Sequence, residues 1–429
     1  MPYPTLMPLC SAGLPLQSWA NRYFKGYWHR DILDLHRQYG SVVRISPNEV
    51  SIVSPELAKT IYSYSGGTPK TGWYDVWRAL GGTEGRKSTA VSFFGSTDPN
   101  EHAFLRRRVS TTYTMSAVLA TEPKVQVVLD SLWERFDEFA NMKQPINLTK
   151  WSSYFTYDVV GTLCISEPLG FIRDRGDKIG FISGVHEAFY WYYRRGFLRV
   201  AAEKVLQRMH DKTKDQRERD MLDHFLEMKE PQGQPVTLPE LLADVGNLFA
   251  AGADTSSVAI RVVLLPLLAD PARYQRLKSE IDAARAAAGI MGDSEKALSY
   301  HEIKDLPFLS ACVKEGSRMH PSIIWQLPRK APSGGINIEG HYISPSATVS
   351  ISPLAQNRCQ AILGEDADEW RPERWIAGEG NSSERIKEMD KNLATVKSSL
   401  RISKTELMLI IAILWLRFPN MCRAELGNI

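Results

Sequence analysis

The chain has 429 residues, of which 43% are hydrophobic and 24% are charged, as is usual for a globular protein with a large core. The net charge of +3, with no Lys/Arg run longer than the triplet at 106–108, argues against a nucleic-acid-binding protein. Five scattered cysteines show no CxxC pair and no zinc-like spacing, which indicates reduced intracellular thiols.

No uninterrupted run of about 18 apolar residues appears, so the sequence predicts no transmembrane helix. The ten residues LMLIIAILWL at 407–416 are expected to form a buried helix. The first 16 residues lack the basic start and the long apolar core of a signal peptide.

The first elements in chain order are a helix and a small β region. The segment HRDILDLHRQYG predicts a helix that stops at Gly40. Apolar residues on both sides of Pro47-Asn48 predict a β-hairpin over residues 42–53, and a short helix is expected over 55–63. Residues 66–95 are rich in Gly, Thr and Ser and are expected to be loop with one short helix.

A helical region follows. The pattern predicts three helices, over residues 102–119, 122–141 and 148–165. Arginines at three successive positions, 106–108, point in three directions on a helix, so most of this run is expected to be a solvated face. The aromatic cluster at 189–193 lies in a predicted helix over 179–209. This helix either packs on the core or forms a patch at the substrate and membrane surface.

The most informative helix is predicted over residues 238–269. It is apolar on most of its faces, as expected of a helix that runs through the core of a large domain. The segment AGADT at 251–255 interrupts it with Gly and polar residues, which are poor choices inside a helix. One interpretation is a core helix with a tolerated Gly252 and a surface Asp254. The other is a groove opposite a flat cofactor, in which Asp254 and Thr255 manage protons.

Two further motifs follow a predicted helix over 271–289. The segment FLSACVKEGSRMHP places Glu315 and Arg318 three residues apart on one helix face, where they can pair. Alternating residues over 336–352 predict a small sheet of hairpins. The segment RPERW then supplies Arg374.

In this order, the AGADT, ExxR and PERW motifs resemble those of the cytochrome P-450 family, the haem-thiolate monooxygenases. The resemblance extends from the hairpin near Val42 to the helix that ends near Phe418. It implies a mainly α fold with a small β lobe. We therefore expect a single cytochrome P-450-like domain over residues 1–429, with small β-sheets near 42–53 and 336–352.

The resemblance also implies roles for ten residues. Asp254 and Thr255 would deliver protons to oxygen on the iron, next to Ala251 and Gly252 of the same motif. A buried structural triad would comprise Glu315, Arg318 and Arg374. The haem propionates would contact His102, Arg106 and Arg329, where His102 replaces the Trp that usually precedes the family's helical Arg by four residues.

The implied activity is the oxidation of an apolar small molecule by O₂ and haem (iron protoporphyrin), with NADPH-cytochrome P-450 reductase as electron donor. The overall style resembles fungal microsomal members that act in secondary metabolism. We expect no nucleic-acid partner. The family implies the cytoplasmic face of the endoplasmic reticulum with peripheral membrane contact, while the missing anchor makes a cytosolic protein the alternative.

One family motif is missing. Members carry a loop FxxGxRxCxG whose Cys thiolate ligates the iron. Here family-like flanks enclose only VKSSLR at 396–401, with no Cys, so no metal ligand is assigned. Cys312, Cys359 and Cys422 are expected to be ordinary small side chains rather than substitutes.

Two explanations of the missing loop stay open: an error in the gene model or in splicing, and a true loss. With a true loss, the protein would be a catalytically inactive, haem-poor binding or scaffold protein. An unrelated α-helical protein that binds apolar ligands is a third possibility, which would make the ordered motifs coincidental.

Overall fold

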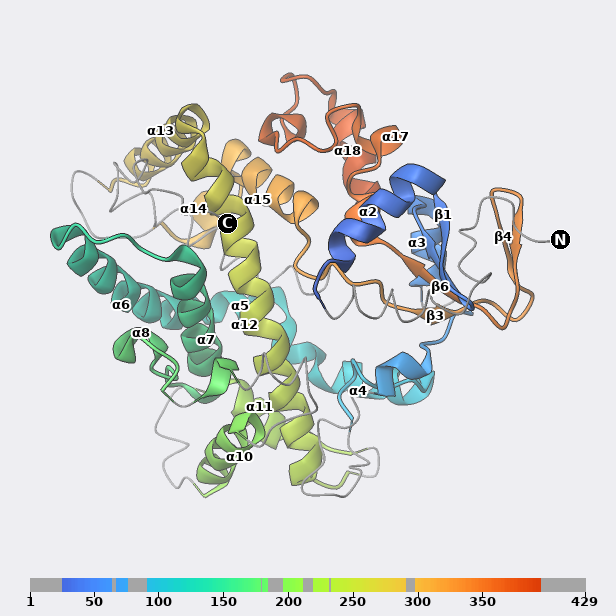
Figure 1. The fold of residues 1–429 in the computed structure, drawn as a ribbon. Helices are drawn as coiled ribbons and strands as arrows, with labels where there is room; N and C mark the ends of the chain where they lie inside the picture. The colour runs from blue at the N-terminus through green and yellow to red at the C-terminus, as the bar shows by residue number, and fades with distance from the viewer. Residues whose placement is uncertain are drawn as a thin grey trace. The chain divides into compact units, whose positions relative to one another are not determined.

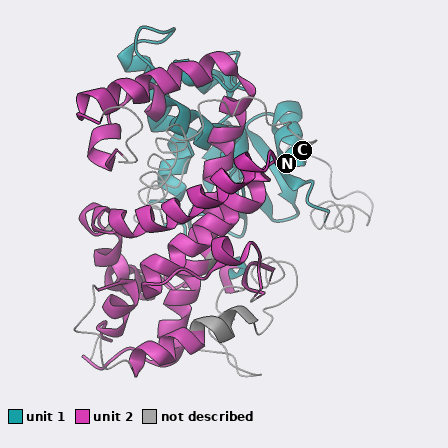
Figure 2. Ribbon diagram, turned by 90° about the vertical axis from the view of Figure 1, so that its left-hand side faces the viewer, with its two compact units in different colours: residues 1–73, 311–397 teal, residues 74–310, 398–429 magenta. Residues whose placement is uncertain are grey.

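The structure is a computed structural model that describes residues 25–63, 67–75, 91–178, 180–183, 196–210, 219–230, 233–290 and 298–394. Helices dominate it, and the strands are few and short (Figure 1). The mainly α fold class with a small β lobe is therefore confirmed. The chain divides into two compact units (Figure 2): unit 1 comprises residues 1–73 and 311–397, and unit 2 comprises residues 74–310 and 398–429. The expectation of one domain over residues 1–429 stays a prediction.

Unit 1 contains two sheets. Strands β1 (Val42–Ser46), β2 (Glu49–Ile52), β6 (Thr348–Ile351) and β3 (Arg329–Lys330) form one sheet in the order β1-β2-β6-β3. Strands β4 (Ile336–Ile338) and β5 (His341–Ile343) form a separate antiparallel hairpin.

The hairpin over residues 42–53 is confirmed, but the sheet predicted over 336–352 is wrong in its pairing. Strand β6 does not join the hairpin β4-β5; it pairs in parallel with β2, with Glu49 opposite Thr348. The physical reason is burial. In this register Val349 and Ile351 join Val50 and Ile52 in one hydrophobic cluster, a long-range contact that local alternation cannot indicate.

The helices of unit 1 are shorter than the longest helices of unit 2. They are α2 (Trp28–Tyr39), α3 (Pro55–Ile61), most of α15 (Pro307–Met319), α16 (Pro353–Gln356), α17 (Gln360–Leu363), the 3₁₀ turn η4 (Pro372–Trp375) and α18 (Ser383–Asn392). Gly40 ends α2 with φ +89°, a conformation that favours glycine, and Ser54 caps α3 by accepting a bond from Leu57 N.

Unit 2 contains the longer helices. They are α4 (Pro99–Val109), η2 (Ser110–Tyr113), α5 (Met115–Ala120), α6 (Glu122–Asn141), α7 (Leu148–Ile165), α8 (Phe171–Asp174), α10 (Gly196–Met209), α11 (Met221–Leu226), α12 (Leu238–Ala269), α13 (Pro271–Ala287) and α14 (Tyr300–Ile303). The predicted helices over 122–141, 148–165 and 238–269 are confirmed with the same bounds.

The single helix predicted over 102–119 is wrong. Helix α4 begins earlier, at Pro99, because the Asp98 carboxylate accepts bonds from the amides of Asn100 and Glu101. It ends at Val109, where the Ser110 hydroxyl donates to Arg107 O and the chain tightens into η2. Hydroxyl side chains that bond to the nearby backbone thus divide the predicted helix.

Helix α12 is the central helix of unit 2 and packs most extensively on α7. Within the described ranges it is the one helix long and apolar enough to span a membrane, and 53% of its most apolar window is buried. This burial is typical of a core helix. The predicted aromatic cluster at 189–193, the apolar segment at 407–416 and the segment at 396–401 lie outside the described residues.

Candidate functional site

The AGADT motif lies near the middle of α12, and the structure divides its residues between two directions. Gly252 faces α7: a Cβ there would come within 3.3 Å of Val160 Cγ2. The close approach that Gly252 permits is to this helix, and the groove opposite a flat cofactor stays a prediction. Ala251 is instead exposed, with Thr255 and Val258 partly exposed on the same side of α12.

Thr255 bonds to the helix that carries it. Its hydroxyl donates to Ala251 O at 2.6 Å, one turn earlier. A hydroxyl that bonds back to the helix in this way competes weakly with the backbone ladder and can also offer its oxygen to an approaching ligand. The accessible face of α12 therefore carries a hydroxyl group between the small side chain of Ala251 and the apolar one of Val258.

Asp254 is held by a residue that the sequence did not suggest. The Tyr157 hydroxyl, on α7, donates to Asp254 Oδ1 at 3.2 Å. Tyr157 is fully buried, and its ring packs edge-on against Phe171 and Phe181. Burial, and then the charge of Asp254, raise the pKa of Tyr157, so this phenol stays a donor. Asp254 is thus neither a free surface carboxylate nor an isolated buried one.

Unit 1 contains a buried cluster of ionised side chains around Glu315. Glu315, Arg318 and Arg374 are all 0% exposed. Arg318 donates through Nε and Nη2 to the two Glu315 oxygens at 2.8 Å, and Arg374 Nε donates to Oε1 at 2.9 Å. The structure therefore brings together the three residues of the predicted triad.

Glu315 receives two further bonds. Trp375 Nε1 donates to Oε2 and the Arg371 amide to Oε1, both at 2.8 Å. Burial alone would raise the pKa of Glu315, but the hydrogen bonds and charges of Arg318 and Arg374 keep it below its usual value. The carboxylate therefore stays ionised, and its bonds connect α15 to the PERW segment.

Arg329 lies in β3, next to a cation that the sequence analysis missed. Its backbone forms a bridge with that of Lys70, and its guanidinium lies over the Tyr62 ring at 5.3 Å. Burial, and then the positive charge of Arg329, lower the pKa of Lys70 to about 7. A carboxylate bound here would favour the protonated form of Lys70 beside Arg329, so the pair suits an anionic ligand. Lys70 follows a Gly-Gly-Thr-Pro segment that gave no signal in the sequence.

His102 and Arg106 lie on α4, in unit 2, with His102 partly buried and Arg106 exposed. The solvated face expected for the arginine triplet holds for Arg106 and Arg107, which are exposed. Since the prediction concerned most of the run, it is confirmed, and Arg108 is the exception, with a side chain that is 3% exposed and ion-paired. Spacing alone could not show which arginine points inward.

The described residues contain three cysteines, and none of them lies in the segment where the P-450 family has its ligand loop. Cys164 and Cys312 are fully buried, and Cys359 is partly exposed before α17. Burial raises the pKa of Cys164, which disfavours a thiolate there. The residues present thus fit the carboxylate groups of a haem, through Lys70 and Arg329, but not its iron.

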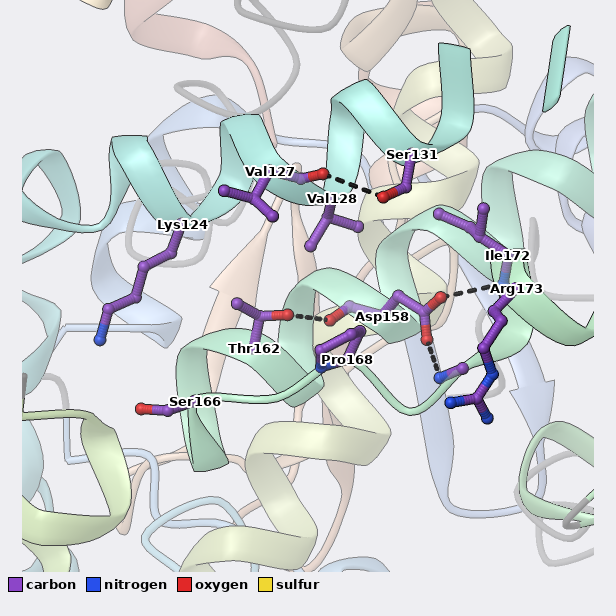
Figure 3. A pocket seen from close by; sticks show the side chains of 11 residues that line it. Lys124, Val127, Val128, Ser131, Asp158, Thr162, Ser166, Pro168, Ile172 and Arg173 are labelled. Atoms are coloured by element: carbon purple, nitrogen blue, oxygen red, sulfur yellow. Dashed lines mark hydrogen bonds between the residues drawn. The ribbon is translucent and has the colours of Figure 1, made fainter. Parts of the chain in front are cut away.

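A cavity of about 370 Å³ lies between α6, α7 and the start of α8 (Figure 3). Val127, Val128 and Ile172 form part of its apolar wall. The buried Asp158 carboxylate accepts bonds from the amides of Gly170, Phe171 and Ile172, and Thr162 donates to Asp158 O. These polar groups are satisfied within the protein, so they stabilise the turn into α8 rather than select a ligand.

Comparison with known proteins places nearly all of the described region in one family. The family model for cytochrome P450 matches residues 2–191 and 192–389. The match ends before the VKSSLR segment at 396–401.

The similar relatives include fungal proteins. A cytochrome P450 monooxygenase of Aspergillus flavus is 28% identical over 408 residues, which cover 87% of this chain and 78% of the relative. Cytochrome P450 monooxygenase gsfF of Penicillium aethiopicum is 30% identical over 80% of this chain and 73% of its own. Cytochrome P450 monooxygenase cicH of Emericella nidulans is 30% identical over 82% of this chain and 75% of its own.

Proposed function

The chain belongs to the cytochrome P450 family, and from this premise we propose that it is a haem-dependent monooxygenase that oxidises an apolar small molecule in fungal secondary metabolism. The observation that carries the proposal is the buried cluster of Glu315, Arg318 and Arg374, since three fully buried ionised side chains are costly unless they bond to one another. The residues of the ExxR and PERW motifs thus contact one another in the structure.

The proposal gives each unit a part. In unit 2, Asp254 and Thr255 of α12 would hold protons, with Ala251 and Gly252 beside them, and His102 and Arg106 of α4 would hold a haem propionate. In unit 1, Arg329 and the neighbouring Lys70 would hold a propionate. The two units together would form the single domain expected over residues 1–429.

The proposed partners follow from the family. NADPH-cytochrome P-450 reductase would supply electrons, and the protein would lie at the cytoplasmic face of the endoplasmic reticulum with peripheral membrane contact. An apolar substrate suits the apolar character of α12.

A second candidate function is favoured by one specific observation. Residues 396–401 contain no cysteine, so the thiolate that the family's oxygen chemistry requires is not supplied there. A chain with this segment as its natural sequence would be a non-catalytic P450-like protein that binds apolar ligands. The two candidates differ in iron ligation and share the fold.

Sequencing the transcript across residues 394–405 separates the candidates first. A Gly- and Cys-containing insert would support the monooxygenase, and a transcript that matches the printed sequence would favour the non-catalytic protein. The second measurement is the carbon monoxide difference spectrum of the purified chain with added haem. A thiolate-type spectrum from the chain as printed would overturn the second candidate, and its absence from a chain with the insert would overturn the first.

A further inference from the structure

A second buried ionic cluster lies in unit 2, away from the AGADT motif. The Arg108 guanidinium, on α4, contacts three carboxylates: Glu230 at 2.5 Å, Asp244 at 2.9 Å and Glu240 at 4.0 Å. Asp244 and Glu240 lie on α12, and Glu230 lies in the segment between α11 and α12. One arginine thus connects three parts of the chain.

The cluster is well shielded from water. The side chains of Arg108 and Asp244 are 3% and 2% exposed, and those of Glu230 and Glu240 are 24% and 22% exposed. With all four groups ionised, one positive charge faces three negative charges. Within the described ranges no group of three His, Cys, Asp or Glu side chains is placed to hold a metal ion, so a metal does not balance this excess.

The position of Arg108 on α4 gives the cluster a consequence for the proposed propionate contacts. His102 and Arg106 are four residues apart and share one face of α4, whereas Arg108 is rotated about 200° from Arg106 at roughly 100° per residue. An arginine anchored on α12 therefore fixes the rotation of α4 and, with it, the direction in which His102 and Arg106 point.

We propose that Arg108 is a positioning residue that fastens α4 and the segment around Glu230 to α12, and that its three carboxylates make this latch tighten on mild acidification. The part that concerns His102 and Arg106 rests on the proposed function, whereas the latch itself does not. Asp244 is the group that titrates, and Glu230, which no helix holds, is the group that moves.

The direction of the pH effect follows from the groups around Asp244. These are Arg108, Glu230, Glu240 and the Tyr113 phenol. Burial raises the pKa of Asp244 to about 6, against the opposing effect of Arg108, and burial followed by the charge of Glu240 raises that of Glu230. A raised carboxyl pKa means that the folded chain holds a proton which the unfolded chain releases near pH 4. The stabilisation is therefore complete below about pH 4 and is lost as the pH rises through about 6.

Amide hydrogen exchange of the full chain tests the latch without haem. After correction for the intrinsic rates, exchange in the segment that carries Glu230 should rise about threefold to fourfold between pH 5.5 and pH 7.5, as the raised pKa of Asp244 allows. Asp244→Asn should reduce this change to less than about twofold, because a neutral side chain no longer adds to the negative excess. Arg108→Gln should give rapid exchange at both pH values.

Arg107→Gln is the matched control, since it removes an exposed cation from the next position of α4 and should leave exchange as in the parent chain. If Arg108→Gln does not fold, Asp244→Asn and Glu230→Gln still decide the matter. Exchange that is independent of pH in the parent chain, or unchanged pH dependence in Asp244→Asn, would overturn the latch. Haem titration of the same variants tests the latch and its effect on the propionate contacts separately. If hydrogen exchange responds as expected but Arg108→Gln leaves haem affinity unaffected, only the link to His102 and Arg106 is refuted.

Discussion

The two units bury ionic clusters of opposite composition. In unit 1, Arg318 and Arg374 share Glu315. Their remaining N–H groups donate to backbone carbonyls such as Ala367 O and Asp366 O and, from Arg374 Nη1, to the partly exposed Asp366 carboxylate. In unit 2, three carboxylates share Arg108, whose buried Nε has no acceptor among the described residues. Buried charges stabilise a fold only when their bonds are complete. The first cluster should therefore be robust and the second sensitive to pH.

Among the changes considered, replacing Glu315 should lower the free energy of unfolding most. Glu315→Gln leaves two buried guanidinium groups without their common carboxylate, and we expect a loss of about 3–5 kcal/mol in the free energy of unfolding. Urea denaturation at pH 7.5 measures it. Glu365→Gln, at an exposed position of the same unit, is the control and should have almost no effect. A loss of less than about 1 kcal/mol for Glu315→Gln would contradict the structural role of this cluster.

Acidification should have opposite effects on the stability of the two units. Burial lowers the pKa of His36 to about 4, although its bond to Gly40 O opposes this. Because the folded chain keeps His36 neutral while the unfolded chain takes up a proton near pH 6.5, stability falls as the pH drops from about 6.5 to 4, by up to about 3 kcal/mol. The same change tightens the Arg108 latch.

Hydrogen exchange in β1 and β2 measures this effect of His36. A chain of hydrogen bonds ends at His36: Trp28 Nε1 donates to Gln326, Gln326 donates to Ser51, and Ser51 bonds to His36 Nε2. This chain requires a neutral ring, which donates from Nδ1 to Gly40 O. His36→Gln should remove most of the acid sensitivity, and His29→Gln in the same helix should not. Equal sensitivity in parent and His36→Gln chains would assign the effect to another group.

Asp244→Asn should stabilise the chain at neutral pH. The pKa of Asp244, raised to about 6 even with the opposing effect of Arg108 included, corresponds to an unfavourable contribution of up to about 3 kcal/mol at pH 7.5. We expect a gain of about 1–3 kcal/mol at pH 7.5 and roughly half as much at pH 5, because the unfolded carboxyl is already ionised there. Thermal unfolding at the two pH values tests this. Destabilisation at pH 7.5 would mean that the carboxylate is better satisfied than its neighbours indicate.

Trp375→Phe should have the smallest effect. It removes the bond from Nε1 to Glu315 Oε2 and keeps most of the ring volume, so we expect a loss of about 1 kcal/mol. The melting temperature of the variant measures the loss. An effect as large as that of Glu315→Gln would mean that Trp375 acts through packing rather than through this bond.

The long helices of unit 2 could be predicted from the sequence because their signals are local. Helix α12 has Thr237 and Glu240 in a reciprocal capping box at its start and apolar residues at helical spacing throughout. Its predicted bounds agree with the structure. Strand β6 could not be predicted in the same way, since its pairing with β2 joins residues about 300 positions apart.

The candidate site likewise contains residues that the sequence could predict and residues that it could not. The order of the motifs predicted the family, and the resemblance to that family then implied that Glu315, Arg318 and Arg374 lie together. Tyr157 and Lys70 had no motif of their own. Each acts through a neighbour from another element, Asp254 and Arg329 respectively, so a single sequence holds no spacing that would reveal it.

By itself, the sequence determined the mainly α class, the helices with local capping and periodicity, the family motifs and the absence of a cysteine at 396–401. The tertiary structure decided which arginine of the triplet at 106–108 is buried, that Gly252 packs on Val160, and which carboxylates share a cation. The physical reason is that periodicity and capping act within a few residues, whereas burial and charge pairing depend on elements that meet only when the chain has folded.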